Sequence, residues 1–281
     1  MTPITLSIVC ATIDPPQQVN LLLESIRDGI NGVKSFLNVE LIIVDQNDIG
    51  IFDDLHTSDS VKIIYIQSRV RGLSINRNIG LKHANGAYIM CIDSDCIFDK
   101  SFFINLLYLT NNRRNIDVFM GMITSIEYGK PLFRNWPVNE RSINNFYVWQ
   151  FSTSVNCVWS KAVGTIFDER FGIASTYGSC EDIDFFLRIK GKFLFSPMLI
   201  ISHPDQSSLT IPITKTKSYS YGFGALCRKH ILPFGILFLV LATIKKIIDL
   251  TMRKTSFNIL IISLRSRLKG FIDFSPINDL K

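Results

Sequence analysis

The sequence has no paired cysteines of the CxxC type, and its six cysteines are irregularly spaced, several of them inside apolar runs. This pattern excludes a zinc knuckle and a disulfide framework, and it indicates buried thiols in a reducing compartment. The N-terminus also lacks the basic segment and cleavage site of a secretory signal. We therefore expect the folded chain to stay in the cytoplasm.

Two glycine-rich nucleotide loops are missing as well. A nucleotidyltransferase needs a glycine-rich loop with a basic residue after its first strand, and residues 11–17 (ATIDPPQ) provide neither. No GxGxxG follows a predicted strand, which disfavours a Rossmann dehydrogenase. The nucleotidyltransferase remains an alternative of lower rank.

No apolar run is long enough to cross a bilayer, which takes about 20 residues. The longest, ILPFGILFLVLATI at 231–244, has 14. Residues 215–281 hold 12 Lys and Arg against 3 Asp and Glu, whereas residues 1–214 hold 18 against 21. Apolar runs mixed with basic residues predict helices that lie on an anionic membrane surface, peripheral at its inner face. Core-packing helices with solvated basic faces are the alternative, and nucleic acid is disfavoured because apolar runs separate the charges.

Short apolar runs alternate with amphipathic stretches, which predicts an α/β fold with a largely parallel sheet. We expect a domain over 1–205 and a basic, apolar helical extension over 206–281. The expected strands are 5–11, 39–45, 61–66 and 87–92, all covered on both faces, and the expected helices are 16–29, 73–84 and 100–111. Strand-like runs follow at 116–126 and 151–159, with a helix near 181–190 and a strand near 192–201.

The sharpest chemical feature is Asp93-Ser94-Asp95, directly after the apolar run 87–92. The carboxyl ends of strands in an open α/β sheet are where such folds bind ligands. Paired carboxylates suit Mg²⁺ or Mn²⁺, and the ion in turn holds a diphosphate. Arg77, in the helical stretch before this run, is a candidate for gripping phosphate or for joining the carboxylate cluster.

The stretch GLSINRNIGLKHANGAYIMCIDSDC, residues 72–96, resembles the family 2 glycosyltransferases. SIVCAT, LIIVDQND and FDERFGIASTYGSCEDIDFFLRI match further segments of that family in the same order. Together these segments span residues 5 to about 203. The combination is far more specific than a lone DxD motif.

The resemblance implies a GT-A fold: a mixed, mostly parallel sheet with helices on both faces, here followed by C-terminal amphipathic helices. It also implies an inverting transfer from a nucleoside-diphosphate sugar, with UDP as the expected nucleotide, to a carbohydrate or lipid-linked acceptor. Carried over by position, the donor-binding residues are Thr12, Asp14, Asp45, Arg77 and Asp93, and the metal ligands are Asp95, Asp93 and His203. The sequence departs from the family at Ile13-Asp14 and Gln46-Asn47.

The pair Glu181-Asp182 resembles the family's source of the catalytic base, and we assign that role to Asp182. A carboxylate within reach of the acceptor hydroxyl can take its proton during direct displacement. A cap or a helix-dipole contact is the competing interpretation for Glu181 and Asp184, and Asp184 could also form a helix-surface ion pair with Arg188. A binding module that has kept the fold but lost turnover is the alternative to an enzyme.

Overall fold

The computed structural model describes residues 4–56, 61–205, 212–253 and 255–276. The chain forms two compact units. The first comprises Met1–Arg71, Ile75–Phe167 and Phe185–Gln206, and the second comprises Gly72–Ser74, Asp168–Asp184 and Ser207–Lys281. The expected domain boundary at 205/206 falls beside residues 206–211, which lie outside the described residues, and it stays a prediction.

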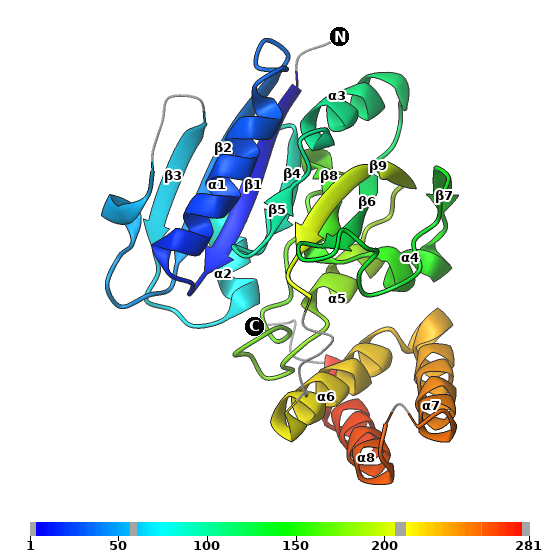
Figure 1. Cartoon of the computed structure of the whole chain (residues 1–281). Helices are drawn as coiled ribbons and strands as arrows, with labels where there is room; N and C mark the ends of the chain where they lie inside the picture. The colour runs from blue at the N-terminus through cyan, green and yellow to red at the C-terminus, as the bar shows by residue number, and fades with distance from the viewer. Residues whose placement is uncertain (1–3, 57–60, 206–211, 254, 277–281) are drawn as a thin grey trace. The chain divides into compact units, whose positions relative to one another are not determined.

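The first unit is built on one mixed sheet (Figure 1). Within the described residues its strands are β1 (Ile4–Thr12), β2 (Leu37–Asp45), β3 (Lys62–Gln67), β4 (Tyr88–Ile92), β5 (Ile97–Phe98), β6 (Val118–Ser125), β7 (Arg141–Ile143), β8 (Cys157–Ser160) and β9 (Phe193–His203). The strand order is β3-β2-β1-β4-β8-β6-β9-β5, and β7 also pairs with β9. β1 runs parallel to both β2 and β4, so their carboxyl ends reach the same edge.

Helices α1 (Pro16–Ile30), α2 (Leu73–His83), α3 (Phe102–Asn112) and α4 (Asn145–Phe151) accompany the sheet. α1 begins at a proline, whose fixed φ suits the first helical position, and it crosses in front of β1 and β2 in Figure 1. α2 packs so closely that a Cβ on Gly80 would lie 2.3 Å from a methyl group of Val9. This close packing holds the helix that carries Arg77 against β1.

The first half of the fold agrees with the sequence expectation, including its parallel strands and connecting helices. Two expectations were wrong in detail. Residues 151–156 close α4 and form a 3₁₀ turn, so the strand expected over 151–159 begins only at Cys157. The strand expected over 61–66 was expected to be covered on both faces. Instead, the residues of β3 are half-buried or exposed, and β3 lies at the edge of the described sheet with a partner on one side only.

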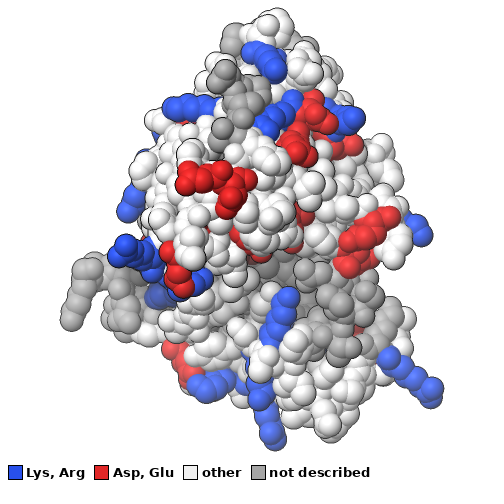
Figure 2. Space-filling model, turned by 60° about the vertical axis from the view of Figure 1, so that its left-hand side comes forward, with Lys and Arg blue, Asp and Glu red and all other residues white. Residues whose placement is uncertain are grey.

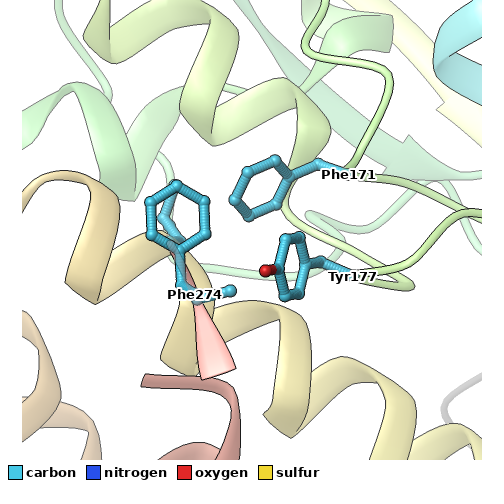
Figure 3. Close-up of a cluster of buried hydrophobic side chains, with 5 residues drawn as sticks. Phe171, Tyr177 and Phe274 are labelled. Carbon is cyan, nitrogen blue, oxygen red and sulfur yellow. The ribbon is translucent and has the colours of Figure 1, made fainter. Parts of the chain in front are cut away.

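The second unit contains the start of α5 (Glu181–Leu187), then α6 (Ile213–Lys229), a π turn (Ile231–Gly235), α7 (Ile236–Thr251) and α8 (Phe257–Asp273). α6 and α8 approach at glycines: a Cβ on Gly224 would lie 2.0 Å from the carbonyl oxygen of Arg267. Phe171, Tyr177 and Phe274 form a buried aromatic cluster beside these helices (Figure 3). The expected C-terminal helices are therefore present.

Among the described residues, no helix combines the length and apolar character needed to cross a membrane.

Candidate active site

The site in the first unit begins where β1 and β4 end. Ser94 Oγ donates to Asp14 Oδ2, and it lies 2.9 Å from Thr12 Oγ1. Because the single Ser94 proton goes to Asp14, the Thr12 hydroxyl donates to Ser94. The Asp14 backbone N–H in turn donates to Thr12 Oγ1 over 2.8 Å. Ser94, the middle residue of the DxD motif, therefore fixes the loop after β1, a role the sequence analysis did not assign.

Arg77 anchors the first carboxylate of the motif. Its Nη2 lies 2.9 Å from Asp93 Oδ1, and its side chain is only 2% exposed while that of Asp93 is 41% exposed. The guanidinium also lies over the Phe167 ring, 5.5 Å from the centroid. Of the two roles expected for Arg77, the structure shows the carboxylate contact, which leaves Asp93 partly open to solvent.

Asp95 and His203 form the centre of the site. His203, the last residue of β9, places Nε2 3.7 Å from Asp95 Oδ1. Its Nδ1 lies 2.8 Å from the carbonyl oxygen of Pro204, which can only accept a hydrogen bond. Nδ1 therefore carries the proton, and in the neutral ring Nε2 holds the lone pair that a metal ion needs.

The electrostatics of Asp95 also suit an added cation. Burial raises the pKa of Asp95, the neighbouring His203 opposes the rise, and Asp93 and Asp14 add to it. Three carboxylates therefore concentrate negative charge at the ends of β1 and β4. A divalent ion between Asp95 and His203 would relieve that repulsion.

Cys96 Sγ lies within 4.8 Å of the Asp95 and His203 donor atoms, so geometry alone includes it among possible metal ligands. The thiol is fully buried, and burial raises its pKa well above the usual value, with Asp93 and Asp95 adding to the rise. A protonated, soft sulfur does not suit Mg²⁺ or Mn²⁺. The side chains that suit a divalent ion are therefore those of Asp95 and His203, and the Cys96 thiol packs in the core beside them.

Asp45, at the end of β2, is fully buried. Its carboxylate accepts hydrogen bonds from the Asn47 backbone (2.9 Å) and side chain (2.8 Å), the Ile51 backbone (3.2 Å) and the Tyr65 hydroxyl (2.5 Å). Burial and the bond to Asp45 raise the pKa of Tyr65 to about 12. Asp45 thus organises the loop after β2, and Asn47, a departure from the family pattern, is one of its partners. A contact between Asp45 and a nucleotide base stays a prediction.

The acidic block of the second unit lies at the start of α5. Asp182 Oδ1 accepts a hydrogen bond from the Ile183 backbone over 2.8 Å, within the first turn of α5, and Glu181 is 9% exposed. The expectation of a surface residue was wrong for Asp184, which is fully buried and lies 2.9 Å from Lys229 Nζ and 2.8 Å from His230 Nε2. The sequence analysis missed both basic partners because they come from the far end of α6, 45 residues or more away.

The expected site residues thus divide between the units. Thr12, Asp14, Asp45, Arg77, Asp93, Asp95 and His203 belong to the first unit, and Glu181 and Asp182 belong to the second. The contacts of Ser94, Arg77 and His203 bring the first group together, except for Asp45, whose contacts lie in the loop after β2. Convergence of Asp182 with Asp93 and Asp95 stays a prediction.

A sheet whose strand ends hold a DxD motif defines a class of folds that bind nucleotide sugars, and comparison with known proteins gives the family. Residues 7–160 match Glycosyl transferase family 2. This match covers more than half of the chain, so the chain belongs to that family of sugar-transferring enzymes.

One relative is the minor teichoic acid biosynthesis protein GgaB of Bacillus subtilis (strain 168), 33% identical over 115 residues. That match covers 38% of this chain and 13% of GgaB. The fold is similar to that of S. aureus TarS residues 1–349, with a TM-score of 0.59 and 14% identity over 81% of this chain and 64% of TarS. The TarS complex with UDP-GlcNAc gives a TM-score of 0.58 and 15% identity over 81% and 66% of the two chains. These structural likenesses confirm the GT-A fold.

Proposed function

We propose that this chain transfers a sugar from a nucleoside-diphosphate donor to a hydroxyl group, using a divalent metal ion. The observation that supports this most is the pairing of Asp95, the last residue of the DxD motif, with His203, at the carboxyl ends of strands in a family 2 chain. UDP is the proposed nucleotide, because a structure of similar fold is a complex with UDP-GlcNAc.

Asp95 and His203 would hold Mn²⁺ or Mg²⁺, and Asp93 would contact the ion or the ribose. When bound, the ion supplies positive charge to the departing diphosphate. Three contacts hold these side chains in place for binding. Arg77 fixes Asp93, and the Pro204 carbonyl fixes the tautomer of His203. Ser94 fixes the loop that would line the nucleoside pocket.

Asp182 is the proposed base, with Glu181 beside it. It would take the proton of the acceptor hydroxyl while that oxygen forms a bond to the anomeric carbon. The bond from that carbon to the diphosphate oxygen breaks on the opposite side, and the nucleoside diphosphate leaves with the electron pair. The sugar carbon is inverted, and no covalent enzyme intermediate is needed.

Donor hydrolysis and transfer, measured with a panel of nucleotide sugars and Mn²⁺ or Mg²⁺, test this function. Asp95→Asn should remove the response to metal, and Asp182→Asn should lower kcat by about 10²–10⁴-fold while UDP binding, measured by calorimetry, persists. Asp53→Asn, an exposed position on a 3₁₀ turn, is the matched control and should behave as wild type. Full turnover in both site variants rejects the assignment, and binding without turnover in the wild type favours a binding module.

The proposed acceptor is a carbohydrate of a polysaccharide or a lipid-linked precursor of one. Support comes from the relative GgaB, whose name assigns it to teichoic acid biosynthesis. The chain covers only 13% of GgaB. Sugar transfer to polysaccharide or lipid-linked acceptors extracted from cells therefore tests the acceptor directly.

We further propose that α7 rests on an anionic membrane surface. Phe238 is its buried residue among those described, and seven large apolar side chains, each 37–54% exposed, follow one helical face: Ile236, Leu237, Val240, Leu241, Ile244, Ile247 and Ile248. Lys245, Lys246 and Arg253 lie at its C-terminal end. In the lower part of Figure 2, Lys and Arg side chains stand apart from one another on a largely uncharged surface.

The exposed apolar face of α7 could be covered by a bilayer or by a second copy of the protein, and the charge of the surrounding segment favours the bilayer. Residues 215–281 have an excess of nine positive charges, which repels a second copy of the same face and attracts anionic lipid by about 1 kcal/mol per basic residue near the surface. Apolar side chains on one face and lysines beside them are the arrangement of an interfacial helix.

Co-sedimentation with phosphatidylcholine vesicles, with and without phosphatidylglycerol, tests the docking. We expect salt-sensitive binding to the anionic vesicles that Ile244→Asp/Ile248→Asp abolishes. Val138→Asp, at an 85% exposed apolar position of the first unit, is the control. The proposal is rejected if the double variant still binds the anionic vesicles. It is also rejected if the wild type self-associates and the double variant loses that self-association instead of vesicle binding.

A further inference from the structure

The end of α6 reaches two carboxylates from different segments, Asp168 in the FDERFG segment and Asp184 in the first turn of α5. Lys229 Nζ lies 2.6 Å from Asp168 Oδ2 and 2.9 Å from Asp184 Oδ1. His230, the next residue, places Nε2 2.8 Å from the same Asp184 oxygen. Since an ionised carboxylate only accepts hydrogen bonds, Nε2 of His230 is the donor in this contact.

These charges are buried together. Asp184 is fully buried, and the side chains of Lys229 and Asp168 are 16% and 13% exposed. Burial by itself would raise the pKa of Asp168, but hydrogen bonds from Arg170 and Lys229 lower it well below its usual range. Desolvated charges of this kind are stable only as a group, so the loss of one partner leaves the others unpaired.

The buried group controls a short helix. α5 has seven residues, too few for a helix to be stable by itself, and Asp182 and Asp184 both lie in its first turn. The Asp184 backbone N–H donates to the Cys180 carbonyl over 3.0 Å, so the turn starts directly before Glu181. Holding the Asp184 side chain therefore sets the direction in which Asp182 leaves the helix.

We infer that Lys229, assisted by His230, is a positioning residue for the acidic pair Glu181-Asp182, so the C-terminal helical segment takes part in the reaction as well as in docking. This inference rests on the proposed role of Asp182 as the base. A lysine 45 residues from Asp184 in sequence belongs to no motif that the sequence analysis identified.

Kinetics of Lys229→Met and Lys229→Arg, with Lys217→Met as control, test it. Lys217 is exposed on the same helix. We expect kcat of Lys229→Met to fall by at least about tenfold, since small displacements of reacting groups are costly, while the donor KM stays within about twofold. Lys229→Arg should recover most of kcat because a guanidinium can bridge both carboxylates. Asp184→Asn, which keeps the side-chain shape, replaces Lys229→Met if that variant does not fold.

Thiol labelling of Cys180 gives a readout that does not depend on activity. Cys180 directly precedes Glu181, and it should react several times faster in Lys229→Met than in wild type or Lys217→Met. A folded Lys229→Met with wild-type kcat and wild-type Cys180 labelling overturns the inference. If Asp182→Asn is fully active while Cys180 labelling still rises in Lys229→Met, the base assignment fails and the anchoring by Lys229 stands.

Discussion

The two units treat clustered carboxylates in opposite ways. In the first, Asp14, Asp93 and Asp95 gather at the ends of β1 and β4, and the pKa of Asp95 is raised. In the second, Asp168 and Asp184 meet Lys229, and the pKa of Asp168 is lowered. In the second unit Lys229 pairs with both carboxylates, whereas Asp95 in the first unit lies between other carboxylates and His203. Under the proposed function, the carboxylates of the first unit bind a metal ion and those of the second stabilise the fold.

The largest effect should come from placing a permanent cation beside Asp95. His203→Lys would place an ammonium near Asp95, neutralise it and repel a divalent ion. We expect metal-dependent turnover to fall by about a thousandfold and thermal stabilisation by Mn²⁺ with UDP to disappear. His203→Gln, which keeps an oxygen ligand, should lose less. Undiminished metal-dependent turnover in His203→Lys would remove the contrast between the units.

In the second unit, the aromatic cluster can be tested apart from the charges. Phe274 is 3% exposed and lies 5.5 Å from the Tyr177 ring and 6.0 Å from the Phe171 ring. Phe274→Ala should cost about 3–4 kcal/mol of unfolding free energy through the cavity it leaves. Hydrogen exchange should show the loss in α6 and α8 and not in β1 or β2. Phe257→Ala, at a 63% exposed position of α8, should change the unfolding free energy little. An equal loss of unfolding free energy in both variants would contradict the role of Phe274 in the aromatic cluster.

The glycine contact between α6 and α8 should produce the next effect. Gly→Ala normally stabilises a helix by up to about 1 kcal/mol. At Gly224 the new methyl group would overlap the Arg267 carbonyl, so Gly224→Ala should instead cost about 2 kcal/mol. Urea denaturation measures the sign, with Gly32→Ala as control because nothing lies within 4 Å of the Cβ it would add. Stabilisation by Gly224→Ala would show that the helices do not pack at this residue.

The smallest effect concerns acid stability. Because the folded pKa of Asp168 is depressed, its contribution is fully present above the ordinary carboxyl pKa of about 4 and is lost as pH falls further. We therefore measure the free energy of unfolding by urea denaturation between pH 3 and 7. Below pH 4 it should fall by about 1 kcal/mol more in wild type than in Asp168→Asn. Parallel curves would show that Asp168 titrates alike in the folded and unfolded states.

The sequence predicted the parallel half of the fold because β1, β2 and β4 are continuous apolar runs, and their ends follow directly as Thr12, Asp45 and Asp93. The family resemblance also indicated His203, which the structure places 3.7 Å from Asp95, and its role as a metal ligand stays a prediction. It missed Ser94 as the residue that fixes the Asp14 loop, because a serine hydroxyl has many possible partners.

The Asp184–Lys229 pair was missed for a different reason. Helical spacing suggested Arg188 as the partner of Asp184, whereas the contact with Lys229 depends on how α6 packs on a distant segment. Local periodicity reports neighbours within one helix and says nothing about which residue a buried side chain meets across a core.

The burial of Phe171 by Phe274 joins positions about a hundred residues apart. During synthesis the FDERFG segment leaves the ribosome long before α8 does, and until then its aromatic side chains have no counterpart to cover them. The aromatic cluster beside the Glu181-Asp182 turn therefore stays incomplete until α8 has been synthesised. A ribosome stalled before α8 would present a formed sheet that carries the Asp95–His203 pair, and a Glu181-Asp182 turn that lacks its covering aromatic ring.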